Sequence, residues 1–131
     1  MGAYEKSKTL AERAAWEFVE ALPEEEKIEL TTVCPGFILG PTLVREGPSG
    51  ECMKMFMNNS FPGGYIPLLN FGIVDVREVA LAHVRCIERD AAQGKRFLLS
   101  GKALWFREIA LILHEKYGPQ GYTIPRTEAK R

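Results

Sequence analysis

The sequence of 131 residues has no excess of charge of either sign and no long apolar run. Lysine and arginine together number 17, and so do aspartate and glutamate, which makes the formal net charge zero. A protein that binds nucleic acid or an anionic membrane needs a basic excess, so this balance argues against both partners. No apolar run approaches the ~20 residues that would cross a bilayer. The N-terminus shows no secretory leader, and a cytoplasmic location is expected.

Cysteine and histidine are also scarce. The three cysteines, Cys34, Cys52 and Cys86, are far apart and form no C-x-x-C motif. This pattern argues against a disulfide framework and against a zinc site, and we expect three ordinary half-buried thiols in a reducing compartment. The two histidines, His83 and His114, have no partner spacing that suggests a triad or a metal site. No metal ligand set is therefore predicted.

The first clear element is a helix predicted over residues 3–22. Leu10, Ala14, Phe18 and Leu22 recur at four-residue steps, while Glu12 is expected mainly on the other side. A strand is predicted over 28–34, ending before a loop that begins at Pro35-Gly36. A helix, a short loop and a strand in this order favour a parallel α/β sheet.

The rest of the chain continues the same alternation. The predicted elements are a loop over 36–50, a helix over 49–60, a strand over 71–76, a helix from Asp75 onward, a strand over 95–101 and a helix over 105–118. Asp75 and Glu78 have the spacing of a capping box, so Asp75 is interpreted as a helix cap rather than a catalyst. In the last helix, Ile109, Ile112 and Leu113 are expected to face inward. The polar tail after Gly118 is predicted to be extended loop.

Two groups of side chains could serve a site. Tyr4 and Lys8 are four residues apart on a helix, so they share one face. A cation near a phenol favours the phenolate, which makes proton exchange with a carbonyl oxygen feasible. The same spacing also arises by chance on an exposed helix, so both interpretations stay open. The apolar side chains at 53, 56, 57 and 61 could line a pocket or pack a core.

Three blocks in order identify a resemblance. They are Tyr4-Glu5-Lys6-Ser7-Lys8 on the first helix, the run from Val33 to Pro41 (VCPGFILGP), and the run from Val74 to His83 (VDVREVALAH). Together they resemble the extended short-chain dehydrogenase/reductase family, also called the NAD-dependent epimerase/dehydratase superfamily. The branch they look most like contains dihydroflavonol reductases, cinnamoyl-CoA reductases and aldehyde reductases.

The resemblance implies a fold and a division of the chain into two functional regions. The fold is α/β, the C-terminal part of a Rossmann-like doubly wound sheet with a small substrate-side region. Residues 1–41 are expected to end the cofactor-domain core, and 42–131 to form the substrate-side region with one further core strand and helix at about 71–90.

The resemblance also implies site residues. Tyr4 would transfer the proton in carbonyl reduction, and Lys8 would make that phenol more acidic and bind the nicotinamide ribose. The loop beside the nicotinamide would be formed by Pro35, Gly36, Phe37 and Ile38. The cofactor would be NADP(H) or NAD(H), the substrate a small aldehyde or ketone, and one candidate partner a second copy bound through the first helix.

The sequence departs from the family pattern in one large respect. It contains no G-x-G-x-x-G or G-x-x-G-x-x-G, the motif whose backbone accepts the pyrophosphate of a dinucleotide. The family's catalytic serine or threonine, upstream of the tyrosine, has no counterpart either. We therefore expect a portion of a longer reductase that alone is inactive and binds the cofactor weakly. Two alternatives stay open: a non-catalytic remnant acting as a dimerisation module, and a nucleotide-sugar epimerase or dehydratase.

Overall fold

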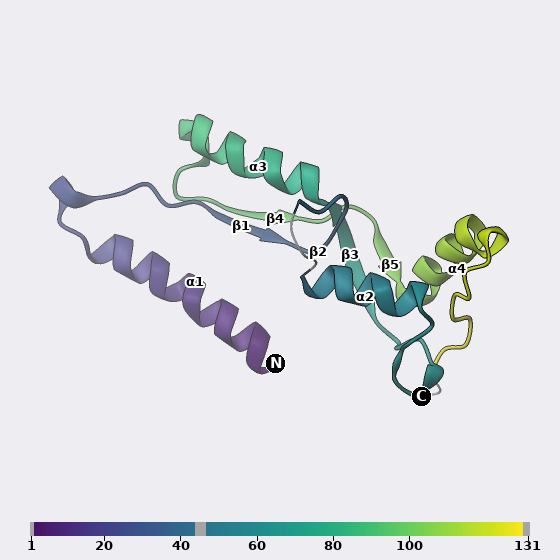
Figure 1. Cartoon of the computed structure of the whole chain (residues 1–131). Coiled ribbons are helices and arrows are strands. Elements are labelled where there is room, and N and C mark those ends of the chain that lie inside the picture. Colours follow the sequence, from purple (N-terminus) through teal and green to yellow (C-terminus); the bar gives the residue numbers. More distant parts are fainter. Residues whose placement is uncertain (1, 44–46, 130–131) are drawn as a thin grey trace. The chain divides into compact units, whose positions relative to one another are not determined.

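The computed structural model describes residues 2–43 and 47–129 (Figure 1). The chain divides into two compact units. The first unit contains Met1–Cys34 and Leu81–Leu98, and the second contains Pro35–Ala80 and Leu99–Arg131. The functional division expected at residue 41 stays a prediction.

The first unit is built around helix α1 (Ala3–Ala21). Ala-rich sequence favours the helix, which ends at Leu22 because a residue before proline is pushed to extended backbone. A short 3-10 turn, η1 (Glu24–Glu26), leads to strand β1 (Thr32–Pro35), which pairs with β4 (Arg96–Leu99). The Thr32 amide donates to the carbonyl of Lys95 at 3.0 Å.

Helix α3 (Val76–Glu88) and the 3-10 turn η3 (Asp90–Ala92) precede β4. In the described part of the first unit, Ala92 alone is a buried apolar residue, and α1 contains none. This unit therefore relies on half-buried side chains and polar contacts rather than on a deep apolar core.

The second unit contains a three-stranded sheet. Its strands are β2 (Phe37–Leu39), β3 (Asn70–Asp75) and β5 (Ala103–Trp105), in the order β2-β3-β5. β2 runs parallel to β3, with Phe37 opposite Ile73, and β3 runs antiparallel to β5. The parallel pairing agrees with the predicted α/β class, while the antiparallel strand β5 was not predicted.

Two helices and two 3-10 turns complete the second unit. Helix α2 (Pro48–Met57) begins with proline at its first position, where the missing N–H costs nothing. The turn η2 (Pro62–Gly64) follows it. Helix α4 (Phe106–Tyr117) begins where the Glu108 carboxylate accepts the Trp105 amide at 2.7 Å, and η4 (Gly118–Gln120) follows.

An apolar core lies in the second unit between α2, α4 and the segments around them. Phe56 is fully buried, with its ring centroid 4.7 Å from that of Phe61 and 5.4 Å from that of Phe106. The other buried members of this cluster are Ile66, Ile109, Ala110 and Ile124. Burying each aromatic side chain contributes roughly 1.5–3 kcal/mol, so this cluster dominates the stability of the unit.

Several sequence predictions are wrong in detail. Residues 28–30 lie outside any strand, and the segment predicted as loop contains β2. Ile112 is 54% exposed, because Phe106, Ile109 and Leu113 share a helix face on which it does not lie. The tail is not free loop: Ile124 is buried, and the Ala129 amide donates to the carbonyl of Ile66 at 2.9 Å.

Candidate active site

Tyr4 and Lys8 lie together on the first turns of α1. The Lys8 Nζ is 5.5 Å from the centroid of the Tyr4 ring, within the range of a cation–π contact. The Tyr4 side chain is 70% exposed, so the phenol is open to solvent. The Ser7 hydroxyl donates to the Tyr4 carbonyl at 2.7 Å, a local bond that holds the first turn. The structure thus brings the sequence-predicted tyrosine and lysine together on one exposed face.

The segment Pro35–Ile38 lies in the second unit at the junction of β1 and β2. The Gly36 amide donates to the carbonyl of Leu99 at 2.9 Å, and the backbone of Gly36 passes against Gly72. The Phe37 ring stacks on Phe71 with centroids 5.6 Å apart. Gly36 therefore lets the chain turn from one strand pairing to the next in a space where no side chain fits.

An open cavity of about 510 Å³ lies beside this segment in the second unit. Its walls include Ile38, Gly40, Ser49, Met53, Lys54 and Met57. The sequence left open whether the apolar side chains at 53, 56, 57 and 61 line a pocket or pack a core. Phe56 and Phe61 belong to the buried core, whereas Met53 and Met57 are half-buried and line the cavity. The cavity offers an apolar wall with few polar groups, which suits a small organic molecule.

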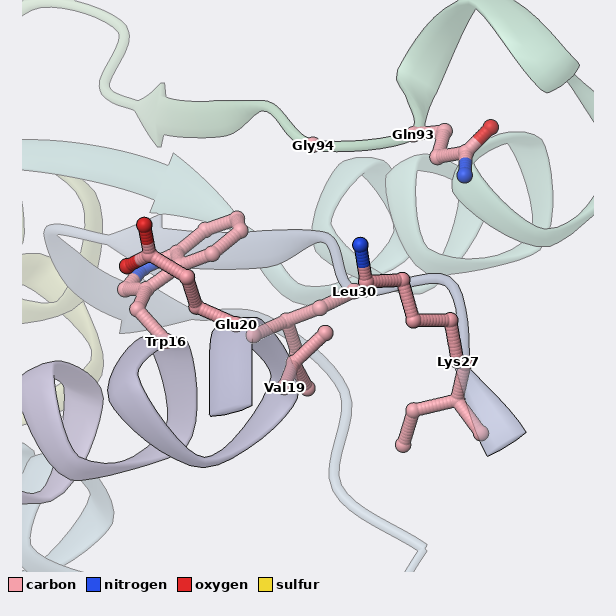
Figure 2. Close-up of a pocket in the computed structure, with 8 residues that line it drawn as sticks. Trp16, Val19, Glu20, Lys27, Leu30, Gln93 and Gly94 are labelled. Atoms are coloured by element: carbon pink, nitrogen blue, oxygen red, sulfur yellow. The ribbon is translucent and has the colours of Figure 1, made fainter. Parts of the chain in front are cut away.

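A second, smaller cavity of about 310 Å³ lies in the first unit (Figure 2). Trp16, Val19 and Glu20 of α1 line it, with Leu30 and Gly94 from the segments that lead into the strands. None of its lining residues is a sequence-predicted site residue, so it is not part of the candidate active site.

A polar cluster that the sequence did not predict centres on Glu12 of α1. Its Oε1 accepts hydrogen bonds from the Arg96 Nε at 2.7 Å and from the Thr32 hydroxyl at 3.0 Å. The Cys34 thiol lies 3.9 Å from Oε2, and the Trp16 indole also donates to this carboxylate. The Arg96 hydrogen bond, followed by those from Thr32 and Trp16, lowers the pKa of Glu12 against the opposing effect of desolvation.

Glu12 was expected on the solvent side of α1, and that expectation is wrong. Its side chain is 22% exposed, whereas Leu10 and Phe18 are 51% and 62% exposed. The periodicity of apolar residues therefore marks the outer face of α1 in this chain. Arg96, the partner of Glu12, is 84 residues away in sequence, so no local pattern could have revealed this contact.

The remaining candidates behave as ordinary structural groups. The Asp75 carboxylate accepts the Arg77 amide at 2.8 Å at the start of α3, which confirms its interpretation as a helix cap. Hydrogen bonds from the Arg77 side chain and then from its backbone amide lower the pKa of Asp75 to about 2. The three cysteines are free thiols of intermediate burial, as expected, and desolvation raises the pKa of Cys52.

Within residues 2–43 and 47–129, no group of three or more His, Cys, Asp or Glu side chains could hold a metal ion. Across the same residues, none of the helices is sufficiently long and apolar to pass through a bilayer.

Comparison with known proteins gives a consistent group of relatives, although no protein-family model matches the chain. The NADPH-dependent methylglyoxal reductase of Saccharomyces cerevisiae is 34% identical over 123 residues, which cover 89% of this chain and 36% of that protein. A cinnamoyl-CoA reductase of Medicago truncatula is 35% identical over 115 residues, covering 87% of this chain and 33% of that protein. The chain thus spans about a third of the length of these relatives.

Solved structures agree with the sequence relatives. The yeast methylglyoxal/isovaleraldehyde reductase, solved with NADPH, matches with a TM-score of 0.82 at 32% identity, over 95% of this chain and 38% of that one. Vestitone reductase from alfalfa (Medicago sativa) matches with a TM-score of 0.72 at 30% identity, over 92% of this chain and 36% of that one. These relatives and neighbours are reductases of the extended short-chain dehydrogenase/reductase family, in the branch of cinnamoyl-CoA and aldehyde reductases, and the chain is similar to a C-terminal portion of their Rossmann-like fold.

Proposed function

We propose that Tyr4 and Lys8 are the proton-transfer pair of an NADP(H)- or NAD(H)-dependent carbonyl reductase that acts when the rest of the reductase is present. The contact between the Lys8 ammonium and the Tyr4 ring carries this proposal. An exposed phenol with a cation beside it can give a proton to a carbonyl oxygen and hold the resulting negative charge. The NADPH-dependent reductases among the relatives support the same chemistry.

The residues present fit one end of a nicotinamide cofactor. Lys8 carries three donors on an exposed side chain, which suits a ribose diol next to the Tyr4 hydroxyl. The chain has no G-x-G-x-x-G to accept the pyrophosphate, so the fit is limited to the nicotinamide and its ribose. When bound, the nicotinamide supplies the hydride. Lys8 would hold the ribose, and a role for the segment of Pro35, Gly36, Phe37 and Ile38 beside the nicotinamide is proposed from the family resemblance alone.

In the proposed reaction Tyr4 donates its proton to the substrate oxygen as the carbonyl is reduced to an alcohol. Lys8 stabilises the phenolate until solvent returns the proton. Independently of this pair, the cavity of the second unit beside α2, with Met53 and Met57 on its wall, is proposed to bind the apolar part of a small organic molecule. The isolated chain is proposed to be inactive, because the pyrophosphate anchor and the family's catalytic serine or threonine have no counterpart in its sequence.

A chimera tests this function. The N-terminal portion of the yeast methylglyoxal reductase would be joined to this chain, and methylglyoxal-dependent oxidation of NADPH would be measured. Tyr4→Phe should lower kcat by about 10²–10⁴-fold, the usual worth of a positioned proton donor. The exposed Tyr65→Phe is the matched control and should keep full turnover. Full activity of the Tyr4→Phe chimera would show that Tyr4 is not the proton donor.

A second role, assembly, is supported by the outer face of α1. Leu10 and Phe18 are exposed, and each lies four residues from Ala14. An antiparallel pair of α1 helices with its two-fold axis at Ala14 would place Leu10 of one copy against Phe18 of the other. Such a self-complementary stripe fits an isologous dimer, so the proposed partner is a second copy of this chain.

Sedimentation of the isolated chain separates this role from a purely monomeric one. We expect a dimer that Phe18→Glu converts to a monomer, because the substitution would place a carboxylate inside the contact. Ile87→Glu, at an 87% exposed position on α3, is the matched control and should leave the dimer intact. A wild-type chain that sediments only as a folded monomer would overturn the assembly role.

A further inference from the structure

Lys8 has two acidic neighbours on its own helix. Glu5 lies three residues before it and Glu12 four residues after it, and both spacings allow an ion pair along a helix surface. An ion pair with either carboxylate would draw the ammonium away from Tyr4. The contact of Lys8 with the Tyr4 ring therefore depends on how these two carboxylates are engaged.

The carboxylates of Glu5 and Glu12 both contact groups other than Lys8. The Glu5 carboxylate lies back against Gly2 at the N-terminus of α1, where the helix dipole favours negative charge. The Glu12 carboxylate faces Arg96 and Thr32 on the paired strands β4 and β1. With the neighbouring Trp16 indole as a further donor, Glu12 is engaged on the side away from solvent.

Both short hydrogen bonds of Glu12 reach its Oε1, from the Arg96 Nε at 2.7 Å and from the Thr32 hydroxyl at 3.0 Å. The Cys34 thiol lies 3.9 Å from Oε2, and the Trp16 indole also lowers the pKa of this carboxylate. The positive charge of Arg96 also balances the negative charge of Glu12. An ammonium four residues away therefore gains little by turning toward it.

We infer that Arg96, acting through Glu12, is a positioning residue for the Tyr4–Lys8 pair. With Thr32 it holds the Glu12 carboxylate, which leaves the Lys8 ammonium over the Tyr4 ring. The same bonds attach α1 to β1 and β4 in a unit whose described part has little apolar core. Arg96 acts through Glu12, although it is 84 residues away from it in sequence. This inference rests on the proposed roles of Tyr4 and Lys8.

Nuclear magnetic resonance of the 131-residue chain tests it without an activity assay. An aromatic ring close to the Lys8 ε-methylene group shifts its proton resonance, and the Tyr4→Leu variant supplies the unshifted reference. We expect Arg96→Gln to lose at least half of this shift, because the freed Glu12 carboxylate recruits Lys8. Arg96→Lys retains a charge that balances Glu12 and should preserve the shift. Arg107→Gln, at an exposed arginine of the second unit, is the matched control.

The double variant Glu12→Gln/Arg96→Gln distinguishes an effect of Arg96 on the position of Lys8 from a general role of Arg96 in holding α1 in place. It lacks both charges, so Lys8 has no carboxylate to turn to at residue 12, and the shift should return. If the double variant loses the shift like Arg96→Gln, Arg96 merely holds the helix and the inference is overturned. An unchanged shift in folded Arg96→Gln overturns it too. If circular dichroism shows that Arg96→Gln is unfolded, the Thr32→Val variant is used instead. It removes one hydrogen bond to the Glu12 carboxylate, so the Lys8 shift should decrease. An unchanged Lys8 shift in Thr32→Val counts against the inference.

The proposed function and this inference fail in different ways. If wild-type chain and Tyr4→Leu give the same Lys8 resonance, the Tyr4–Lys8 contact is absent in solution and the proposed proton-transfer pair loses its geometric basis. If the contact is present but insensitive to Arg96 and Thr32, only the positioning role of Arg96 through Glu12 is lost.

Discussion

The backbone of Gly36 lies against the carbonyl oxygen of Gly72, so closely that a Cβ at Gly36 would overlap that oxygen. The obstacle is main chain and cannot rotate away. At this point the chain leaves the pairing of β1 with β4 and begins the pairing of β2 with β3. The close approach explains why glycine follows Pro35 at the junction of β1 and β2.

Gly36→Ala is expected to destabilise the chain by about 3 kcal/mol, at the upper end of the cost of overpacking, because a strand must shift to admit the methyl group. Chemical denaturation measures the change. Gly47→Ala is the control: its Cβ would meet open space at φ −86°, and we expect a change within about 1 kcal/mol. Equal effects at the two glycines would contradict the steric explanation.

Phe56→Ala is expected to cost about 3–5 kcal/mol, because it would empty the centre of the aromatic cluster of the second unit. That is a large part of the 5–15 kcal/mol by which a domain is usually stable, so partial unfolding is expected at room temperature. Phe71→Ala removes the same side chain from a 39% exposed position and should cost less than half as much. Urea titration of both variants gives the comparison.

Sequence periodicity predicted the long elements well and the short ones poorly. The first helix was predicted over 3–22 and spans Ala3–Ala21, and the strand predicted over 71–76 spans Asn70–Asp75. The three-residue strands β2 and β5 were missed because such short segments show no alternation. Their pairing is set by β3, a partner far away in sequence.

In the candidate site, too, local contacts could be predicted from the sequence and tertiary contacts could not. The Tyr4–Lys8 contact follows from four-residue spacing within one helix, so the sequence could predict it. The Glu12 cluster depends on Arg96 and Thr32, whose positions are fixed by tertiary structure. Apolar periodicity also suggested the wrong inner face for α1, because the pattern cannot say which of two faces a helix buries against its neighbours.

Protonation of Asp75 in acid should lower the free energy of unfolding of the chain. Its folded pKa of about 2 lies below the ordinary value of 3.8 because Arg77 donates to it through side chain and backbone. A lowered pKa stabilises the folded chain above the ordinary value, and this contribution is lost as the pH falls from about 4 to about 2. The difference in unfolding free energy between wild type and Asp75→Asn should therefore shrink over that window.

The control for this titration is Glu17→Gln at an exposed position on α1. Its difference from wild type should change less between about pH 4 and about pH 2 than that of Asp75→Asn. A parallel response of the two variants would mean that general charge repulsion, rather than the Asp75–Arg77 contact, governs acid sensitivity. Urea titrations at several pH values distinguish the two outcomes.

Cofactor affinity should depend on residues that this chain does not contain. The isolated chain retains the Tyr4–Lys8 pair proposed to face the nicotinamide riboside, but it has no glycine-rich motif for the pyrophosphate. We expect a Kd for NADPH above about 1 mM by calorimetry, a binding free energy weaker than about −4 kcal/mol. The chimera with the yeast N-terminal portion should bind at least 100-fold more tightly, and Lys8→Met should weaken that binding. Micromolar binding by the isolated chain would instead reveal a phosphate site within these 131 residues, and the assignment of the anchor to the glycine-rich motif would be wrong.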